Sequence, residues 1–203
     1  MSKGAKLNSE GTICNAASTQ YKNTIKTVSF LIKRGIDINA KTKHGSTALH
    51  CAMNKQPEVV QLLIKSDANL DDEDRYRRTP VFNADERFID YLINAGANVN
   101  YVSKHGDTPL FASFTRHGGK TTIPLIEGWA NINIRNDYHL TPLIVAAITL
   151  TNETAIKYLI NSGADKSVSA SIDMINEYSK LFRKKILKTD KIELTAYDIA
   201  VIK

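Results

Sequence analysis

The sequence predicts an all-α solenoid with short hairpin loops, built from about five repeats and a C-terminal half repeat. Two periodic signals carry this prediction. A position where a helix should stop recurs at spacings of 32, 29, 33 and 34 residues, at Gly35, Asp67, Gly96, Trp129 and Gly163. A threonine-led helix start precedes each stop, as in Thr108-Pro109, where proline suits the first helical turn. A period of about 33 residues with two helices per unit is typical of stacked repeat proteins.

Residues 91–111 show one junction between units in full. An apolar helical face closes before Gly96, at the place where a helix commonly ends in a left-handed residue. An extended segment follows, and Gly106 turns the chain back. Thr108 is then expected to cap the next helix through its hydroxyl oxygen.

The segments Thr47-Ala-Leu-His-Cys-Ala52 and Thr108-Pro-Leu-Phe-Ala-Ser113 resemble ankyrin repeats, over roughly residues 8–168 and the last nine. The resemblance implies one elongated domain, residues 1–203. Its parts are expected at approximately 8–39, 40–71, 72–100, 101–133 and 134–168, with a helical insert at 169–191 and a terminal half repeat at 192–203. His50 matches the family's Thr-x-x-His histidine and is expected to tie neighbouring turns by hydrogen bonds.

The first repeat predicts helices at about residues 12–20 and 24–34, from apolar residues at helical spacing. The third repeat is shorter, because 17 residues separate Thr79 from Gly96 against 20 to 23 in the other four repeats. About one helical turn is therefore missing, which places residues 85–86 in the link between two shortened helices.

The period breaks after the fifth repeat, because 54 residues separate Thr141 from Thr195. The excess predicts an insert whose apolar residues, Tyr178 among them, recur at helical spacing, with Ser171 as a candidate cap. Its far end, residues 180–191, is basic. Two explanations of that charge stay open. The basic residues could form the solvated face of a packed helix, or they could contact a polyanion or a partner. Residues from Thr195 onward are expected to form one final helix.

Composition places the chain among foldable proteins, with 42% apolar residues, 24% charged residues and a formal net charge of +6. No apolar run is long enough to cross a membrane, and residues 1–8 lack the apolar core of a signal peptide. We therefore expect a cytoplasmic, intracellular protein, or one delivered into a host cell if the source is a pathogen. Cys14 and Cys51 are expected to be small buried thiols in a reducing compartment.

No grouping of residues predicts catalysis, a metal site or a cofactor. The five histidines fall mostly at hairpin tips or links and follow the architecture. Gly119-Lys120-Thr121 invites comparison with a phosphate-binding loop, but that pattern needs a glycine where Phe114 stands and a strand before it. We therefore expect a protein without enzymatic activity.

The hairpin tips offer the best candidate surface. Each tip pairs a charge with an aromatic ring, and arginine and aromatic residues are enriched in binding hot spots. Successive tips are expected to lie side by side as a row along the concave face. Exposure alone would also make hairpin tips polar. The predicted partner-binding residues are Lys43, His44, Arg75, Tyr76, Arg77, Arg78, Lys104, His105, Trp129, Tyr138 and His139.

Trp129 breaks a local rule, because a helix stop normally needs positive φ, which costs a non-glycine residue about 1 kcal/mol. Three explanations stay open. The indole could pack against the next repeat, it could be exposed as an anchor for a partner, or a register shift could place Gly128 at the turn.

These features predict a monomeric scaffold that binds another protein through its concave face and hairpin tips. Two alternatives stay open. The basic tips and residues 180–191 would also suit nucleic acid or an anionic membrane surface, and a steep salt dependence would reveal such binding. The C-terminal segment could instead recruit other machinery, as the resemblance to ankyrin proteins of viruses and intracellular bacteria implies.

Overall fold

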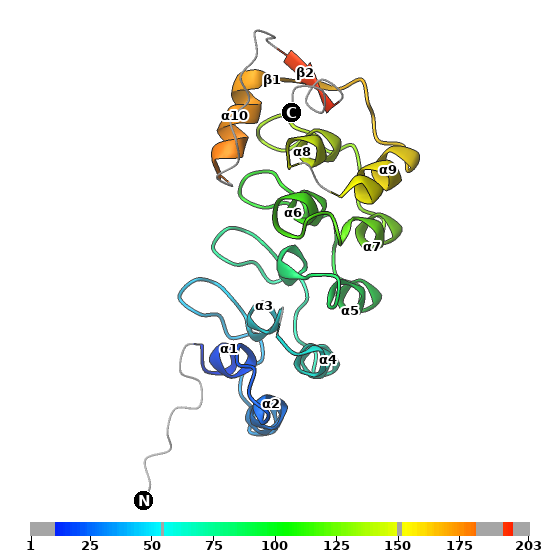
Figure 1. The fold of residues 1–203 in the computed structure, drawn as a ribbon. Helices are drawn as coiled ribbons and strands as arrows, with labels where there is room; N and C mark the ends of the chain where they lie inside the picture. The colour runs from blue at the N-terminus through cyan, green and yellow to red at the C-terminus, as the bar shows by residue number, and fades with distance from the viewer. Residues whose placement is uncertain (1–10, 54, 150–151, 182–192, 197–203) are drawn as a thin grey trace, which may run out of the picture. The chain divides into compact units, whose positions relative to one another are not determined.

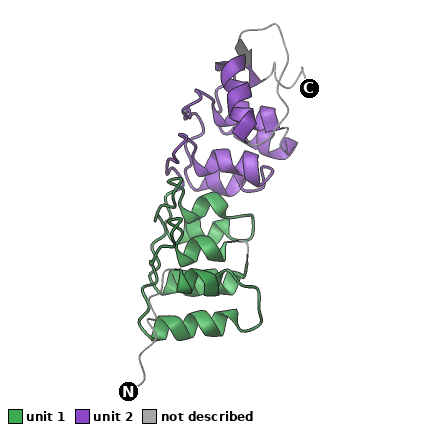
Figure 2. Cartoon of the chain, turned by 90° about the vertical axis from the view of Figure 1, so that its left-hand side faces the viewer, with its two compact units in different colours: residues 1–98 green, residues 99–203 purple. Residues whose placement is uncertain are grey.

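A computed structural model describes residues 11–53, 55–149, 152–181 and 193–196 (Figure 1). Pairs of short helices alternate with hairpin loops along these residues, so the predicted all-α repeat fold is confirmed. The chain forms two compact units, residues 1–98 and 99–203 (Figure 2), and the single domain stays a prediction. None of the helices in the described ranges has the length and apolarity needed to cross a membrane.

In the first unit, each repeat contributes a pair of short helical elements. Their bounds are α1 (Thr12–Ala17), α2 (Thr24–Lys33), α3 (Ala48–Ala52), α4 (Pro57–Lys65), η1 (Pro80–Asn83) and α5 (Ile89–Asn94). The first helices of successive pairs, α1 and α3, pack on each other, as do the second helices, α2 and α4. Ile13, Leu49 and Leu63 are fully buried between them, so the apolar face of each repeat is covered by its neighbour.

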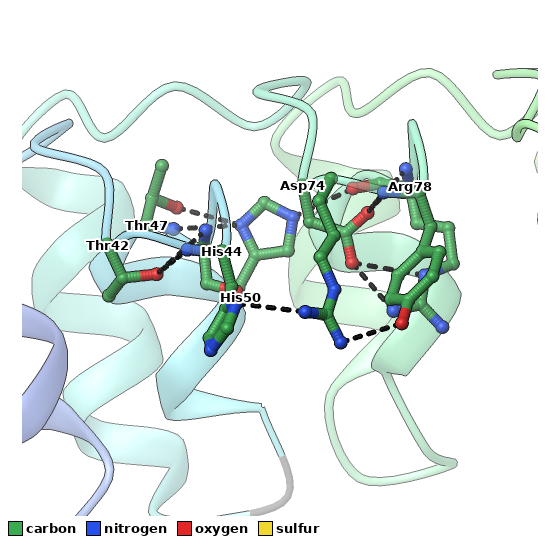
Figure 3. Close-up of polar contacts among 9 residues, drawn as sticks. Thr42, His44, Thr47, His50, Asp74 and Arg78 are labelled. Atoms are coloured by element: carbon green, nitrogen blue, oxygen red, sulfur yellow. Dashed lines mark hydrogen bonds and ion pairs between the residues drawn. The ribbon is translucent and has the colours of Figure 1, made fainter.

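The helix starts are built in different ways. The N–H of Thr47 donates to Nδ1 of His50 at 3.2 Å, and Nε2 of the same ring donates to the carbonyl oxygen of Arg78 at 2.9 Å (Figure 3). His50 therefore ties two repeats together, as predicted.

The expectation that Thr108 caps the next helix is wrong, since its Oγ1 is buried and makes no hydrogen bond in the described structure. Helix α6 (Pro109–Arg116) begins instead at Pro109, whose ring already fixes a helical φ.

The two cysteines are bonded to each other, contrary to the expectation of free buried thiols. Packing of α1 on α3 brings the Cα atoms of Cys14 and Cys51 to 5.4 Å, within the range that a disulfide spans. The disulfide therefore joins the first two repeats. Sequence position alone showed only that both residues lie near helix starts, whereas their distance depends on the stacking.

Neighbouring hairpins hydrogen-bond to each other at their tips. The N–H of Arg75 donates to the carbonyl oxygen of His44 at 2.9 Å, and in the second unit Asp137 donates in the same way to His105 at 3.3 Å. Gly45 has a φ of 78°, and a Cβ at this position would lie 2.9 Å from the backbone nitrogen of Arg75. Glycine is therefore required where the next hairpin docks.

A ladder of side-chain oxygens also joins successive repeats within each unit. Each oxygen accepts a backbone N–H that lies about one repeat further along the chain, and so satisfies a donor outside any helix. At distances of 2.7 to 3.0 Å, the acceptors are Asn39, Asp71, Asn100 and Asn133, and the donors are Asn69, Asn98, Asn131 and Asp165.

The third repeat is shortened, as predicted. Its first element, η1, is a single turn of 3-10 helix, and its second, α5, has six residues. Asp85 lies in the link between them and forms a 2.7 Å ion pair with Arg87. The repeat therefore presents less helical surface to its neighbours than the others do.

The second unit continues the helix pairs and ends differently. Its elements are α6, α7 (Thr122–Glu127), α8 (Pro142–Thr149), α9 (Glu153–Asn161), β1 (Ser169–Ser171), α10 (Ile172–Leu181) and β2 (Glu193–Thr195). The two strands pair antiparallel, with Ser169 opposite Thr195.

This C-terminal part contains two strands in addition to the expected helical segments. The insert predicted at 169–191 begins with strand β1, which was not expected. Its helix starts at Ile172, after the predicted cap Ser171, whose Oγ accepts the N–H of Asp173 at 3.2 Å. The terminal half repeat predicted at 192–203 contains strand β2, which was not expected, and the helical residue Ala196 directly follows Thr195, as at the other threonine-led starts. Residues 182–192 and 197–203, which hold most of the predicted basic cluster and of the predicted final helix, lie outside the described residues.

Candidate functional site

The predicted binding residues fall into two groups, one in each unit. Those of the first unit are Lys43, His44, Arg75, Tyr76, Arg77 and Arg78. Those of the second unit are Lys104, His105, Trp129, Tyr138 and His139. A single row through both groups stays a prediction.

His44, Arg75 and Tyr76 meet at the tips of two neighbouring hairpins and form what we name the tip cluster (Figure 3). The guanidinium of Arg75 donates to Nδ1 of His44 at 2.9 Å and to Oη of Tyr76 at 2.7 Å. Its Cζ also lies 4.6 Å from the centre of the Tyr76 ring, within the range of a cation–π contact. No carboxylate among the described residues forms an ion pair with Arg75, so its charge is available to a partner.

Asp74 organises the hairpin that carries two members of the cluster. Its Oδ1 accepts the N–H groups of Tyr76 and Arg78, at 2.8 and 3.0 Å, and its Oδ2 lies 2.7 Å from Nη2 of Arg78. Burial alone would raise the pKa of Asp74, but the hydrogen bonds from Arg78 and Tyr76 hold that pKa below its ordinary value. The carboxylate therefore stays charged and keeps the hairpin in one conformation.

Arg77 and Arg78 have different surroundings although they are adjacent. Arg78 is half-buried against Asp74, and its Cζ lies 4.5 Å from the centre of the Tyr76 ring, so it supports that ring. Arg77 is exposed, has a φ of 56°, and its Nε lies 3.4 Å from a carboxylate oxygen of Glu73. A role of either in partner binding stays a prediction.

An open groove of about 440 Å³ adjoins the tip cluster. It lies between α1 and the hairpin at residues 42–46, with Asn15, Thr42, Lys43 and His44 among its lining residues. Lys43 is exposed and, like Arg75, has no ion pair with a described carboxylate. The first unit thus presents a cationic and aromatic edge beside a concave surface.

His50 supports this region from beneath without taking part in the surface. Burial lowers the pKa of His50, and the hydrogen bond to the Arg78 carbonyl offsets this only in part. A neutral ring with Nε2 protonated suits both of its hydrogen bonds, so His50 has the structural role expected from the sequence.

In the second unit, helix α10 packs against the hairpin tips. The rings of Tyr138 and Tyr178 meet edge to face with their centres 5.3 Å apart. Oη of Tyr178 donates to one oxygen of Asp107 at 3.1 Å, and the side-chain amide of Asn136 donates to the other at 2.8 Å. Burial raises the pKa of Asp107 to about 6, against the lowering effect of these two hydrogen bonds. Tyr138 is therefore partly covered by this chain itself.

Trp129 is the most exposed large apolar side chain in the described structure, with 88% of its surface accessible. Its φ is 67°, whereas Gly128 has a φ of −80°, so the register shift considered above is excluded. Packing of the indole in the core is excluded as well. The indole is therefore exposed, and its role as an anchor for a partner stays a prediction.

Sequence reasoning missed Asp74, Asp107 and Tyr178. For Asp74 a signal existed, because a short polar residue opens each hairpin and accepts backbone N–H groups further along it. These residues are Thr42, Asp74, Ser103 and Asn136. For Asp107 and Tyr178 no signal existed, since their contact joins residues 71 positions apart.

The described residues bear on the metal site and on the basic cluster considered in the sequence analysis. They contain no group of three potential metal ligands. Lys180, at the start of the predicted basic cluster, forms a 2.8 Å ion pair with Glu177.

Known proteins resemble this chain along most of its length. A family model of ankyrin repeats, three copies long, matches residues 3–74 and 81–170. Ankyrin repeat protein OPG189 of Vaccinia virus (strain Copenhagen) is 28% identical over 108 residues, which cover 52% of this chain and 19% of the relative. Putative ankyrin repeat protein FPV222 of Fowlpox virus is 29% identical over 209 residues, covering 82% of this chain and 28% of the relative.

A cellular relative is similar over a shorter stretch. The probable 26S proteasome regulatory subunit p28 of Saccharomyces cerevisiae is 33% identical over 97 residues, which cover 45% of this chain and 42% of the relative. The chain therefore spans less than half the length of each of these three relatives.

Proposed function

Because the chain belongs to the ankyrin-repeat family, whose members generally bind other proteins and generally lack enzymatic activity, we propose that it is a non-enzymatic interaction module. It binds a partner protein through the tip cluster of the first unit and the groove beside it. The partner contacts an exposed guanidinium, an exposed lysine and an aromatic ring.

The arrangement of Arg75 is the observation that carries this proposal. Its guanidinium is exposed and is held in place by Tyr76 and His44, while no described carboxylate neutralises it. Arginine and tyrosine are the residue types that dominate binding hot spots. A side chain that is already held loses less conformational entropy when a partner binds.

Truncating the tip cluster should therefore abolish partner capture without unfolding the repeats. We expect Arg75→Ala/Tyr76→Ala to weaken binding by about 2 kcal/mol or more, because exposed hot-spot contacts are lost. The partner is first identified by affinity capture on the wild-type chain and mass spectrometry. Its affinity for each variant is then measured by calorimetry, with circular dichroism to verify folding.

Arg87→Ala is the matched control. Arg87 is also an exposed arginine beside an aromatic ring, with Cζ 5.0 Å from the centre of the Phe88 ring, but it lies in the link between η1 and α5. Equal affinities of the tip and control variants would contradict the proposal. So would tight binding of duplex DNA that weakens steeply between low and moderate salt, which is the behaviour of a polyanion-binding protein.

A further inference from the structure

We propose that the outward face of α2 is a second docking surface, which takes an acidic amphipathic helix of a partner protein. This α2 face consists of Ile25, Lys26, Ser29, Phe30 and Lys33, and Arg34 at the end of the helix lies over the Phe30 ring. It lies outside the hairpins, so it is independent of the tip cluster.

Large apolar side chains are exposed together on the α2 face. Phe30 is 53% exposed and Ile25 37%, although the other side of the same helix buries Val28 completely. Tyr21, in the turn before α2, is 77% exposed. An open groove of about 410 Å³ runs along the face between Ile25 and Phe30. Exposed apolar side chains clustered on one helix mark an interaction surface more often than they mark ordinary surface.

The register of the repeats shows that this face is suited to receiving a helix. Phe30 of α2 and Tyr158 of α9 occupy equivalent positions in their repeats, because each comes directly before a buried leucine, Leu31 or Leu159. Tyr158 reaches the helix of the preceding repeat, where its Oη donates to Glu127 of α7 at 3.1 Å. Phe30 therefore faces the side on which a preceding helix would pack, and in the first repeat no described helix lies there.

The positive charge around the α2 face favours a partner helix that is acidic. The segment 11–36 has four cations and no aspartate or glutamate. Lys22, Lys26 and Lys33 form no ion pair with a described residue, while Arg34 lies over the Phe30 ring with its Cζ 4.9 Å from the ring centre. A helix with an apolar stripe flanked by carboxylates would complement both features, as Glu127 does for Tyr158.

Charge disfavours two other occupants. A second copy of the α2 face would place like charges against each other. Residues 1–10 of this chain carry two lysines and one glutamate, so they do not supply the acidic complement.

The test uses the full chain and a fluorescent synthetic helix of about 18 residues, with leucines along one face and glutamates beside them. We expect saturable binding by fluorescence anisotropy, with NMR shift changes confined to residues 21–34. Lys33→Glu should weaken binding about tenfold, and Phe30→Ser similarly, because charge and apolar contact both contribute. The matched control is Lys65→Glu, which lies after Leu63-Ile64 as Lys33 lies after Leu31-Ile32, and should change affinity by less than about twofold.

Several results would overturn the proposal. These are absence of binding, equal binding of a peptide with the same composition but scrambled leucine spacing, or equal effects of Lys33→Glu and Lys65→Glu. Binding of wild-type chain to phosphatidylserine vesicles but not to the peptide would assign the face to a membrane surface instead. A dimer in light scattering that Phe30→Ser dissociates would assign it to a second copy. Arg75→Ala/Tyr76→Ala should leave peptide binding unchanged, so the two proposals fail separately.

Discussion

Among the residues that the structure describes, four non-glycine residues have the left-handed conformation that glycine has at equivalent positions of other repeats: Asp67, Arg77, Trp129 and His139. Trp129 is the most costly of these, since an indole cannot hydrogen-bond locally as an aspartate can. Its ring is almost fully exposed, so little packing is lost when it is removed. The backbone contact at this turn, from the side-chain amide of Asn100 to the carbonyl oxygen of Trp129, does not depend on the indole.

Trp129→Gly should accordingly raise the free energy of unfolding by up to about 1 kcal/mol, because the strain of positive φ is relieved, while partner affinity falls. Urea denaturation measures the first effect and calorimetry with the captured partner the second. Asp67→Gly serves as control and should change stability less. A loss of more than about 2 kcal/mol would contradict this prediction, because removing an exposed indole leaves no cavity in the core.

Asp107 should make the second unit less stable as pH rises. Its folded pKa of about 6 lies above the ordinary value for aspartate, so the folded state binds the proton more strongly than the unfolded state does. The stabilisation from this group is complete below about pH 4 and is lost as pH rises through about 6. Asp107→Asn should remove this contribution.

Urea denaturation of both proteins between pH 4 and pH 7.5 tests this, because only the difference between them isolates Asp107 from other titrating groups. Asp137→Asn, which changes an exposed neighbour, should keep the wild-type dependence. A difference between wild type and Asp107→Asn that stays constant with pH would refute the assignment.

Among the elements, the third repeat should be the least protected interior unit. Its 3-10 turn and six-residue α5 offer few buried backbone hydrogen bonds, and stability in repeat arrays depends on contacts between neighbours. Amide hydrogen exchange should therefore be faster in residues 72–98 than in residues 141–163, whose helix α8 is buried along nearly its whole length. Equal or greater protection of the third repeat would contradict this.

The positions of helices were more predictable from the sequence than the side chains that cap them. The apolar spacing of Ile25, Val28 and Leu31 located α2 within one residue of its observed ends. Identical threonines nevertheless behave differently. Oγ1 of Thr141 accepts the N–H of Ile144 at 3.4 Å, whereas Oγ1 of Thr108 caps nothing in the described structure. Capping depends on a side-chain rotamer set by local packing, which a residue type does not specify.

At the scale of the whole molecule, the repeat period was the strongest signal, and the two compact units lie within it. The boundary at residues 98–99 falls at the end of the shortened third repeat. The net charge of +6 is not spread evenly, since the segment 11–36 has no acidic residue while residues 71–74, at the junction of the second and third repeats, are all acidic. Uneven charge of this kind favours different partners for different surfaces.

The sequence by itself determined the repeat fold, the short third repeat and the structural role of His50, because each depends on spacings shorter than one repeat or on the recurrence of a repeat. Tertiary structure alone decided the Cys14–Cys51 disulfide, across 37 residues, and the contact of Tyr178 with Asp107, across 71. It also decided that Phe30 is exposed where the equivalent Tyr158 packs on a neighbour. These outcomes depend on how the repeats pack against their neighbours. That packing sets which side chains are buried, how far a pKa shifts and whether two cysteines lie close enough to bond.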